Sequence, residues 1–86
     1  MRKLTEQDLA AIIGKEESGY IIKQARVKRG TFTDSDHYGI ALGQNRHTGL
    51  YVTWQFHLED ERPSFYWGHY IENPDTALQD YETREQ

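Results

Sequence analysis

The sequence predicts a single α+β domain built from an N-terminal helix, an antiparallel meander of three to four strands and a C-terminal helix. Two observations support this prediction: apolar residues alternate strictly in the centre of the chain, and helix-start signals stand near both ends. Both helices are expected to cover the same face of the sheet. Because the chain has 86 residues, we expect one hydrophobic core and one domain, spanning residues 1–86.

The stretch Leu50–Ile71 predicts the central β-hairpin. Large apolar residues occupy every second position from Leu50 to Leu58. Successive side chains of a strand point to opposite faces, so this spacing gives one buried face and one wetter face. The charged segment 59–64 interrupts the pattern, and alternation resumes at Phe65. The residues expected on the buried face are Trp54, Phe56, Phe65, Trp67, His69 and Ile71.

Two further strands are predicted before the hairpin. Residues 20–29 alternate imperfectly because Lys23 interrupts the apolar face, and their basic residues are typical of an edge strand. A polar loop over 30–36 leads to a strand over 37–44, and a turn over 45–49 leads into the hairpin. The residues expected to face the core are Ile21, Ala25 and Val27 of the first strand and Tyr38, Ile40 and Leu42 of the second.

Helix-start signals predict one helix at each end of the chain. Thr5 is a favourable N-cap, and the acidic residues that follow it suit the positive end of the helix dipole. This helix should be short and end near Gly14 or Gly19. At the other end Asn73 is the predicted cap and Pro74 the first helical residue, which favours a helix running nearly to the end of the chain.

Composition and charge limit the classes of protein to consider. The chain has no Cys, so no disulfide or thiolate site is expected. No run of residues approaches the roughly 20 apolar residues of a membrane span, and the N-terminus lacks a signal-peptide pattern, so we expect a cytoplasmic protein without a membrane partner. Residues 1–47 carry eight Lys/Arg and six Asp/Glu, whereas residues 48–86 carry two and eight. A basic patch and an acidic C-terminal helix are therefore candidate contact surfaces.

The sequence predicts no catalytic, cofactor or metal site. The four histidines do not occur in an HxH or HExxH arrangement, and no serine lies in a GxSxG motif. The glycines of segment 37–44 fall inside a strand pattern, where they do not form a phosphate-binding loop. We therefore expect a binding protein without enzymatic activity.

The candidate binding surface is the second face of the predicted sheet. We expect the small residues Gly39, Ala41 and Gly43 to lie there beside the tyrosines of the hairpin, because Tyr is enriched at binding surfaces. The alternative is that a helix or loop half-buries this face. The candidate binding residues are Tyr51, Gln55, His57, Tyr66, Tyr70, Arg26 and Lys28.

Several short sequence segments of this chain resemble segments that occur together in other proteins. YVTW stands at 51–54 and YWGHY at 66–70, with GIALG before them and AL and DY after them. Over about residues 37–84 the chain resembles small uncharacterised proteins of Gram-positive bacteria and their mobile elements. The resemblance implies a phage, plasmid or conjugative context and carries no catalytic motif. The order of elements is similar to that of double-stranded RNA-binding domains, but the last helix here begins with acidic rather than basic residues.

Two functional hypotheses follow. In the first, a bacterial accessory or regulatory protein docks a protein partner through the tyrosine-rich face or the acidic C-terminal helix. In the second, bases of single-stranded nucleic acid stack on the tyrosines while the basic strand Gln24–Arg29 binds phosphates. The net charge of −4 disfavours the second hypothesis. A homodimer through an open sheet edge or the tyrosine face is a further alternative.

Overall fold

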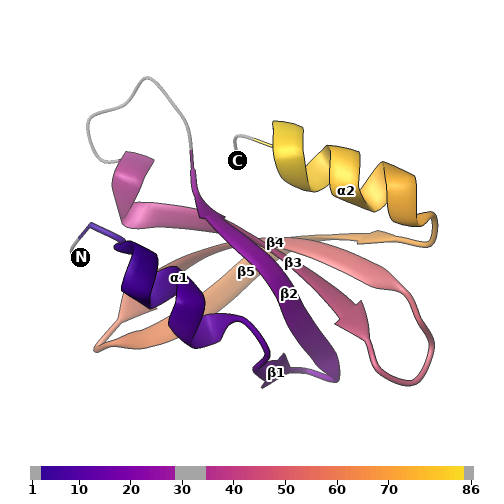
Figure 1. Cartoon of the computed structure of the whole chain (residues 1–86), viewed down its shortest axis with the longest axis horizontal. Helices are drawn as coiled ribbons and strands as arrows, with labels where there is room; N and C mark the ends of the chain where they lie inside the picture. The colour runs from indigo at the N-terminus through magenta and orange to yellow at the C-terminus, as the bar shows by residue number, and fades with distance from the viewer. Residues whose placement is uncertain (1–2, 29–34, 85–86) are drawn as a thin grey trace.

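The computed structural model describes residues 3–28 and 35–84, and these residues form an α+β arrangement (Figure 1). Their elements, in chain order, are α1 (Glu6–Ile12), β1 (Glu16–Glu17), β2 (Tyr20–Val27), the 3-10 helix η1 (Ser35–His37), β3 (Tyr38–Asn45), β4 (Tyr51–Glu59), β5 (Arg62–Ile71) and α2 (Pro74–Thr83). Residues 29–34, which include most of the predicted polar loop and the end of the predicted strand 20–29, lie outside the described residues.

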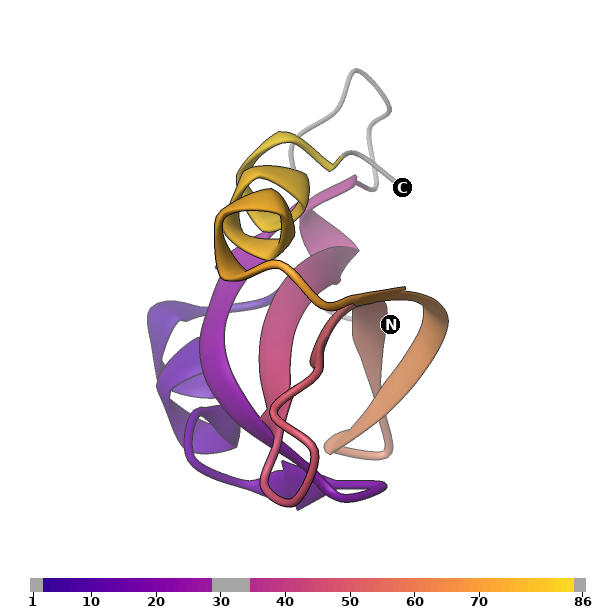
Figure 2. The same ribbon diagram turned by 90° about the vertical axis from the view of Figure 1, so that its right-hand side faces the viewer.

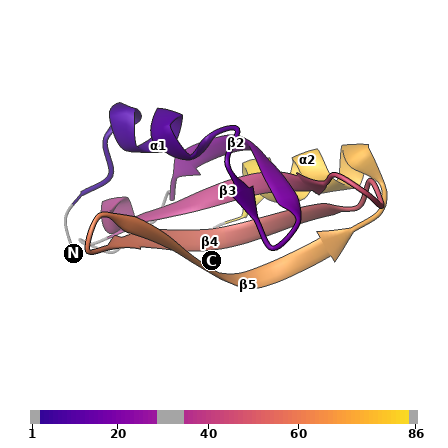
Figure 3. The same cartoon turned by 90° about the horizontal axis from the view of Figure 1, so that it is seen from below.

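The described strands make one antiparallel sheet in which the order in space follows the order in the chain, β1-β2-β3-β4-β5. The predicted meander is therefore confirmed, with five strands in place of three to four. The sheet is curled, and β5 lies at the edge opposite to α1 and β2 (Figure 3). Figure 2 looks toward the start of α2 and shows the helix end-on above the strands of the sheet.

Helix α1 begins as its sequence predicts. The backbone N–H of Asp8 donates to Thr5 Oγ1 at 3.2 Å, and the backbone N–H of Thr5 donates to Asp8 Oδ2 at 2.7 Å. This reciprocal capping box satisfies two N–H groups at the helix start. Leu4 and Ile12 are buried and pack against the first of two apolar clusters. The other buried members of this cluster are Ile22, Ala41, Val52, Trp54 and Phe56.

Helix α2 packs on the opposite face of the sheet from α1. Its buried residues Ala77 and Tyr81 form a second cluster with Ile40 and Leu42 of β3. Neighbouring residues of a strand point to opposite faces, and Ala41 belongs to the cluster beneath α1. The expectation that both helices cover one face is therefore wrong, and the sheet is buried in part on both faces.

The pairing of β3 with β4 explains why the face that was expected to be open is buried. Ala41 pairs with Trp54 and Gly39 pairs with Phe56, so the small residues of β3 lie beside the largest residues of β4. A Cβ on Gly39 would lie 2.4 Å from Phe56 Cζ, which shows how closely the ring covers this glycine. The expected surface of Gly39, Ala41 and Gly43 beside the tyrosines therefore does not form.

Strand β2 departs from simple alternation. Its pairing with β3 shifts between Ile22 and Gln24, so Lys23 is an extra residue at this point. The shift places Ile22, which is 1% exposed, in the core instead of the expected Ile21. Ala25 and Val27 pack against the same core, as predicted.

The hairpin between β4 and β5 is tighter than the sequence indicates. Glu59 pairs with Arg62, so the loop contains only Asp60 and Glu61. Both loop residues have positive φ, 51° and 65°, as a type I′ turn requires. Strand β5 consequently begins within the charged segment that was expected to separate the strands.

Candidate functional site

Strand β5 has a bulge at Trp67 and Gly68. The pairing of β4 with β5 shifts between Thr53 and Gln55, so two residues of β5 lie opposite one residue of β4. Trp67 has φ 55°, in the left-handed region that bulky residues rarely adopt. A Cβ on Gly68 would lie 2.9 Å from Trp54 Nε1, so the bulge needs a glycine at this second position.

The bulge changes the direction of the side chains that follow it. Trp67 is 64% exposed at the sheet edge, and the expectation that it lies in the core is wrong. After the extra residue, Ile71 packs against the cluster beneath α2, and His69 contacts Asp80 of that helix. The expected placement of His69 and Ile71 beside Trp54 is therefore also wrong, whereas Phe65, which precedes the bulge, packs against the core as predicted.

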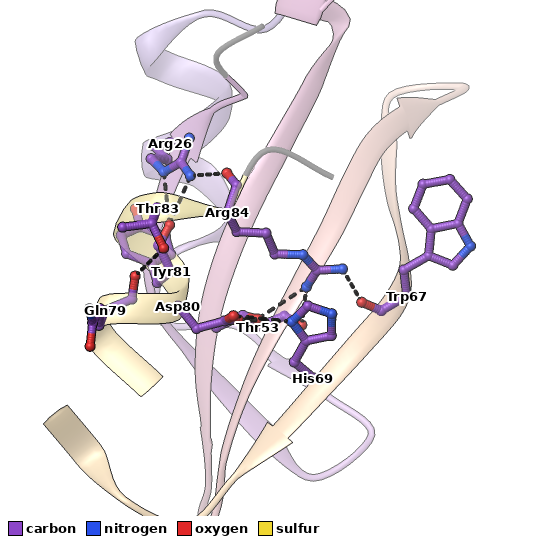
Figure 4. A network of polar contacts seen from close by, with 9 residues as sticks. All are labelled: Arg26, Thr53, Trp67, His69, Gln79, Asp80, Tyr81, Thr83 and Arg84. Carbon is purple, nitrogen blue, oxygen red and sulfur yellow. Dashed lines mark hydrogen bonds and ion pairs between the residues drawn. The ribbon is translucent and has the colours of Figure 1, made fainter. Parts of the chain in front are cut away.

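The guanidinium of Arg84 connects the end of α2 to the bulge (Figure 4). Arg84 Nη1 donates to the carbonyl oxygen of Thr53 at 2.7 Å and to Thr53 Oγ1 at 3.0 Å. Arg84 Nη2 donates to the carbonyl oxygen of Trp67. Because Arg84 is only 6% exposed, these contacts hold the backbone of Trp67 in place from inside the protein.

The carboxylate of Asp80 lies at the centre of the same network. Thr53 Oγ1 donates to Asp80 Oδ2 at 2.5 Å, and His69 Nδ1 lies 3.0 Å from that oxygen. Burial acts to raise the pKa of Asp80, and hydrogen bonds from Thr53 and His69 act to lower it. The charges of His69 and Arg84 act in the same direction, so the pKa of Asp80 lies below its ordinary value. Burial lowers the pKa of the Arg84 guanidinium, and the charge of Asp80 opposes this effect.

Arg26 of β2 binds the C-terminal end of α2. Its Nε and Nη2 donate to the carbonyl oxygen of Tyr81 at 3.0 and 2.8 Å, and Nη2 also donates to the carbonyl oxygen of Arg84 (Figure 4). A cation at this end of a helix satisfies free carbonyl groups and complements the helix dipole. The guanidinium of Arg26 therefore has a structural role in docking α2.

Beyond the end of α2, four rings form a continuous series, which we call the aromatic row: Tyr38, His57, Tyr66 and Trp67. Ring centroids are 6.0 Å apart for Tyr38 and His57, 5.5 Å for His57 and Tyr66, and 5.0 Å for Tyr66 and Trp67. The interplanar angles are 78°, 60° and 83°, so each ring is steeply inclined to the next. Lys28 Nζ lies 5.7 Å from the Tyr38 centroid, at the β2 end of the row.

Hydrogen bonds fix the centre of the aromatic row. Gln55 Nε2 donates to Tyr66 Oη at 3.1 Å, and Tyr66 Oη lies 3.2 Å from His57 Nδ1. Since the hydroxyl accepts from Gln55, its own proton is free to be donated to His57. Burial raises the pKa of Tyr66, the bond from Gln55 opposes this, and Tyr38 adds to it. Within the described residues no donor reaches Gln55 Oε1, although Gln55 is only 3% exposed.

The seven candidate binding residues do not share one surface. His57 and Tyr66 belong to the aromatic row, Gln55 lies beneath it, and Lys28 stands at its end. Arg26 binds α2, and Tyr51 packs against the cluster beneath α2. Tyr70 lies on the opposite face, where its ring centroid is 5.9 Å from that of Tyr20.

Sequence reasoning missed Tyr38 and Trp67 as members of this row. Tyr38 shares a face with Ile40 and Leu42, as expected, but this face lies beneath α2 and Tyr38 is only half-buried. Trp67 was assigned to the core because period-two alternation was extended through β5. The pair Trp67-Gly68 contained a usable signal, since a glycine inside a strand often marks a bulge. A bulge at this point reverses the inward and outward positions that follow.

The chemistry available at the aromatic row is aromatic packing together with N–H and O–H donors. No group of three or more His, Cys, Asp or Glu side chains in the described part of the chain is placed to hold a metal ion. Neither described helix is long and apolar enough to cross a membrane. The chain was also compared with known proteins, and no protein-family model, no curated protein and no solved structure matches it.

Proposed function

We propose that the protein is a small non-enzymatic binding protein that docks a protein partner on the aromatic row. The observation that carries the proposal is Trp67, a large aromatic residue that is 64% exposed and held at φ 55°. A bulky residue in the left-handed region costs about 1–2 kcal/mol. The fold alone gives no reason to place Trp there, and exposed Trp residues frequently dominate protein interfaces.

The row has further properties of a protein interface. Its rings extend from a half-buried hydrogen-bonded centre to the exposed Trp67, which resembles an anchor beside a preorganised surface. The buried Arg84 fixes the carbonyl of Trp67, so the ring is presented from a restrained backbone. Preorganisation of this kind lowers the entropic cost of binding.

Nucleic acid is the alternative partner, and the charges disfavour it. Arg26 donates to carbonyl groups of α2, and Arg84 is buried against Thr53 and Trp67. Neither guanidinium is displayed for binding phosphates. With a net charge of −4, the protein lacks the concentration of cations that phosphate binding requires.

The resemblance of YVTW and YWGHY to small proteins of Gram-positive bacteria supports a cellular context for this proposal. We place the protein in the bacterial cytoplasm, as an accessory or regulatory protein of a phage or other mobile element. The acidic helix α2 is then a less favoured docking surface, because Asp80 is bound to Thr53 and His69 within the fold.

The proposal is tested by selecting binders from a displayed library of random peptides against the wild-type protein. The selected peptides should lose binding to a Trp67→Ala variant and keep binding to Tyr70→Ala. Tyr70 is a matched control because it lies on the same strand, is 62% exposed and belongs to the opposite face. Each variant is first checked for the native fold by its ¹⁵N–¹H correlation spectrum.

Nucleic-acid binding, which is the competing hypothesis, is tested with the same spectra. Titration with single-stranded oligouridine at low salt should leave the Tyr66 and Trp67 resonances unchanged. Shifts concentrated at these residues and reversed by salt would instead favour nucleic-acid binding. A selection that yields no binder, or only binders indifferent to Trp67→Ala, would overturn the proposal.

A further inference from the structure

A hollow lies where β3 turns into β4, at the end of β3 that is farther from the aromatic row (Figure 1). Residues 44–49 line this hollow of about 460 Å³, together with Ile21 and Lys23 of β2. Tyr38 begins β3 and the hollow starts where this strand ends, so the length of the strand separates the two surfaces. The hollow is therefore independent of the surface proposed to bind a protein.

Hydrogen bonds hold the loop that borders the hollow. Asn45 Oδ1 accepts the backbone N–H groups of His47 and Thr48 at 2.8 and 2.9 Å, which fixes the turn. The backbone N–H of Arg46 donates to the carbonyl oxygen of Gly19 at 3.1 Å and connects the loop to the turn between β1 and β2. The side chains of Arg46 and His47 therefore extend from a fixed backbone, and such preorganisation lowers the entropic cost of binding.

Three exposed side chains of the hollow carry N–H donors: Lys23, Arg46 and His47. Lys23 lines the hollow from the point where the pairing of β2 with β3 shifts. Within the described residues, neither the Lys23 ammonium nor the His47 ring has a hydrogen-bond or ion-pair partner. No Asp or Glu is among the described residues that line the hollow, so the lining carries an excess of positive charge.

Arg46 has one ion pair, which leaves part of its guanidinium available. Arg46 Nη1 lies 2.7 Å from Glu16 Oε1, and neither Nε nor Nη2 donates to another described residue. The two side chains are 56% and 44% exposed, so water screens their attraction. The edge formed by Nε and Nη2 offers two parallel N–H groups, which is the arrangement that binds two oxygens of one anion.

We propose that this hollow binds the phosphate group of a small phosphate monoester. Such a group carries a charge of about −1.5 to −2 at pH 7 and three terminal oxygens, so it can accept from Lys23, Arg46 and His47 together. A carboxylate has one charge and two oxygens, which the edge of Arg46 alone would satisfy. The amide of Gln44 and the hydroxyl of Thr48 add polar groups to the lining, which suit a ligand whose remainder is also polar.

Titrations followed by ¹⁵N–¹H spectra test the site. The probes are inorganic phosphate and glycerol 3-phosphate, and the controls are glycerol and sodium chloride at matched ionic strength. Both phosphates should shift the resonances of Lys23 and residues 44–49 in a saturable manner and leave Trp67 unchanged, whereas the controls should cause no such shifts. Shifts that do not saturate, or that spread over all surface Lys and Arg residues, would show adventitious anion binding only and would overturn the proposal.

Charge variants test which residues bind the phosphate. Lys23→Gln and Arg46→Gln should each weaken glycerol 3-phosphate binding about tenfold. Arg62→Gln removes the same charge at the β4–β5 turn, at the other end of the sheet, and should have little effect. Glu16→Gln should strengthen binding about twofold, because its carboxylate no longer competes for Arg46, whereas Glu59→Gln at the far turn should not. Equal effects of the site variants and their controls would mean that only net charge matters, which would contradict the proposal.

Two further comparisons separate this site from nucleic-acid binding and from the protein-binding surface. Oligouridine without a terminal phosphate has only diester groups; if it shifts the residues of the hollow as strongly as glycerol 3-phosphate does, the assignment to a monoester is wrong. Trp67→Ala should bind glycerol 3-phosphate as the wild type does, and Arg46→Gln should still bind the selected peptides. Each proposal can therefore fail while the other stands.

Discussion

At the scale of single residues, the strained Trp67 separates the requirements of folding from those of binding. Its φ of 55° is one that glycine adopts without strain. Trp67→Ala removes the ring and keeps the left-handed backbone, whereas Trp67→Gly removes both the ring and the strain. We therefore predict that the glycine variant is more stable than the alanine variant by about 1 kcal/mol in urea unfolding.

This order of stability is informative because it reverses the usual one. Within an ordinary strand or helix, a protein variant with glycine is less stable than the variant with alanine by about 0.5–1 kcal/mol. Both variants lose the contact of the indole with the Tyr66 ring, so that loss cancels in the comparison. An alanine variant as stable as the glycine variant would show that residue 67 is unstrained and would remove the main support for a functional role.

A second residue-level prediction concerns the close approach of Phe56 to Gly39. A Cβ on Gly39 would lie 2.4 Å from Phe56 Cζ and 2.9 Å from the carbonyl oxygen of Arg26, so a methyl group does not fit without movement. Gly39→Ala should lower the free energy of unfolding by about 1–3 kcal/mol. Gly43→Ala is the matched control, because its nearest contacts would begin at 3.3 Å. Equal losses in the two variants would contradict this account of the packing.

At the scale of elements, the β4–β5 turn is a place where stability can be gained. Asp60 and Glu61 both have positive φ, for which Asn-Gly is the favoured pair. We predict that the double variant Asp60→Asn, Glu61→Gly raises the free energy of unfolding by about 1 kcal/mol. The control Glu61→Ala keeps the left-handed backbone and should show no gain. A stabilised control or an unchanged double variant would indicate that this turn is not strained.

The elements also differ in how far the sequence determines them. The cap signals at Thr5 and Asn73 are local, and both helices begin where these residues predict. The four longer strands were found for the same reason, because their composition and alternation are local properties, whereas the two-residue β1, Glu16–Glu17, has no such pattern and was not predicted. Which face each strand presents depends on pairing with its neighbours, and that pairing includes two shifts, at Lys23 and at Trp67-Gly68. An error of one residue in register exchanges the two faces of a strand.

The candidate site illustrates the same limit. His57 and Tyr66 were predicted to share a surface, and they do, because they lie on neighbouring strands before the bulge. Tyr70 was expected beside them and lies on the other face, because the bulge stands between Tyr66 and Tyr70. Arg26 would bind phosphate under the alternative nucleic-acid hypothesis, but its contact with α2 joins residues 55 positions apart in the chain, which no local pattern predicts.

At the scale of the whole molecule, the two faces of the sheet are stabilised differently. The face beneath α1 holds the larger apolar cluster, built around Trp54 and Phe56. The face beneath α2 has a smaller cluster and adds the polar contacts of Asp80, Arg84 and Arg26. Isolated helices as short as α2 are marginal in water, so its order depends on this docking. Acid should therefore act on the molecule mainly through this second face.

The lowered pKa of Asp80 determines the direction in which acid changes the stability of the protein. This pKa is lower in the folded protein than in the unfolded chain, where it is about 4. The Asp80 carboxylate consequently contributes stability above the unfolded pKa, and this contribution is lost as pH falls through the folded pKa. In Asp80→Asn the charge is absent at every pH, so the variant should be less stable than the wild type by about 1–2 kcal/mol at pH 7.

The difference between the two proteins should then shrink as the pH falls below about 4, because protonation of the wild-type carboxyl removes the same charge that the substitution removes. Urea unfolding of both proteins at several pH values between neutral and acid measures this difference directly. A difference independent of pH would mean that Asp80 acts through its shape and hydrogen bonds alone. In that case the docking of α2 would depend on the apolar cluster and the two arginines, and acid would destabilise the protein through other carboxylates.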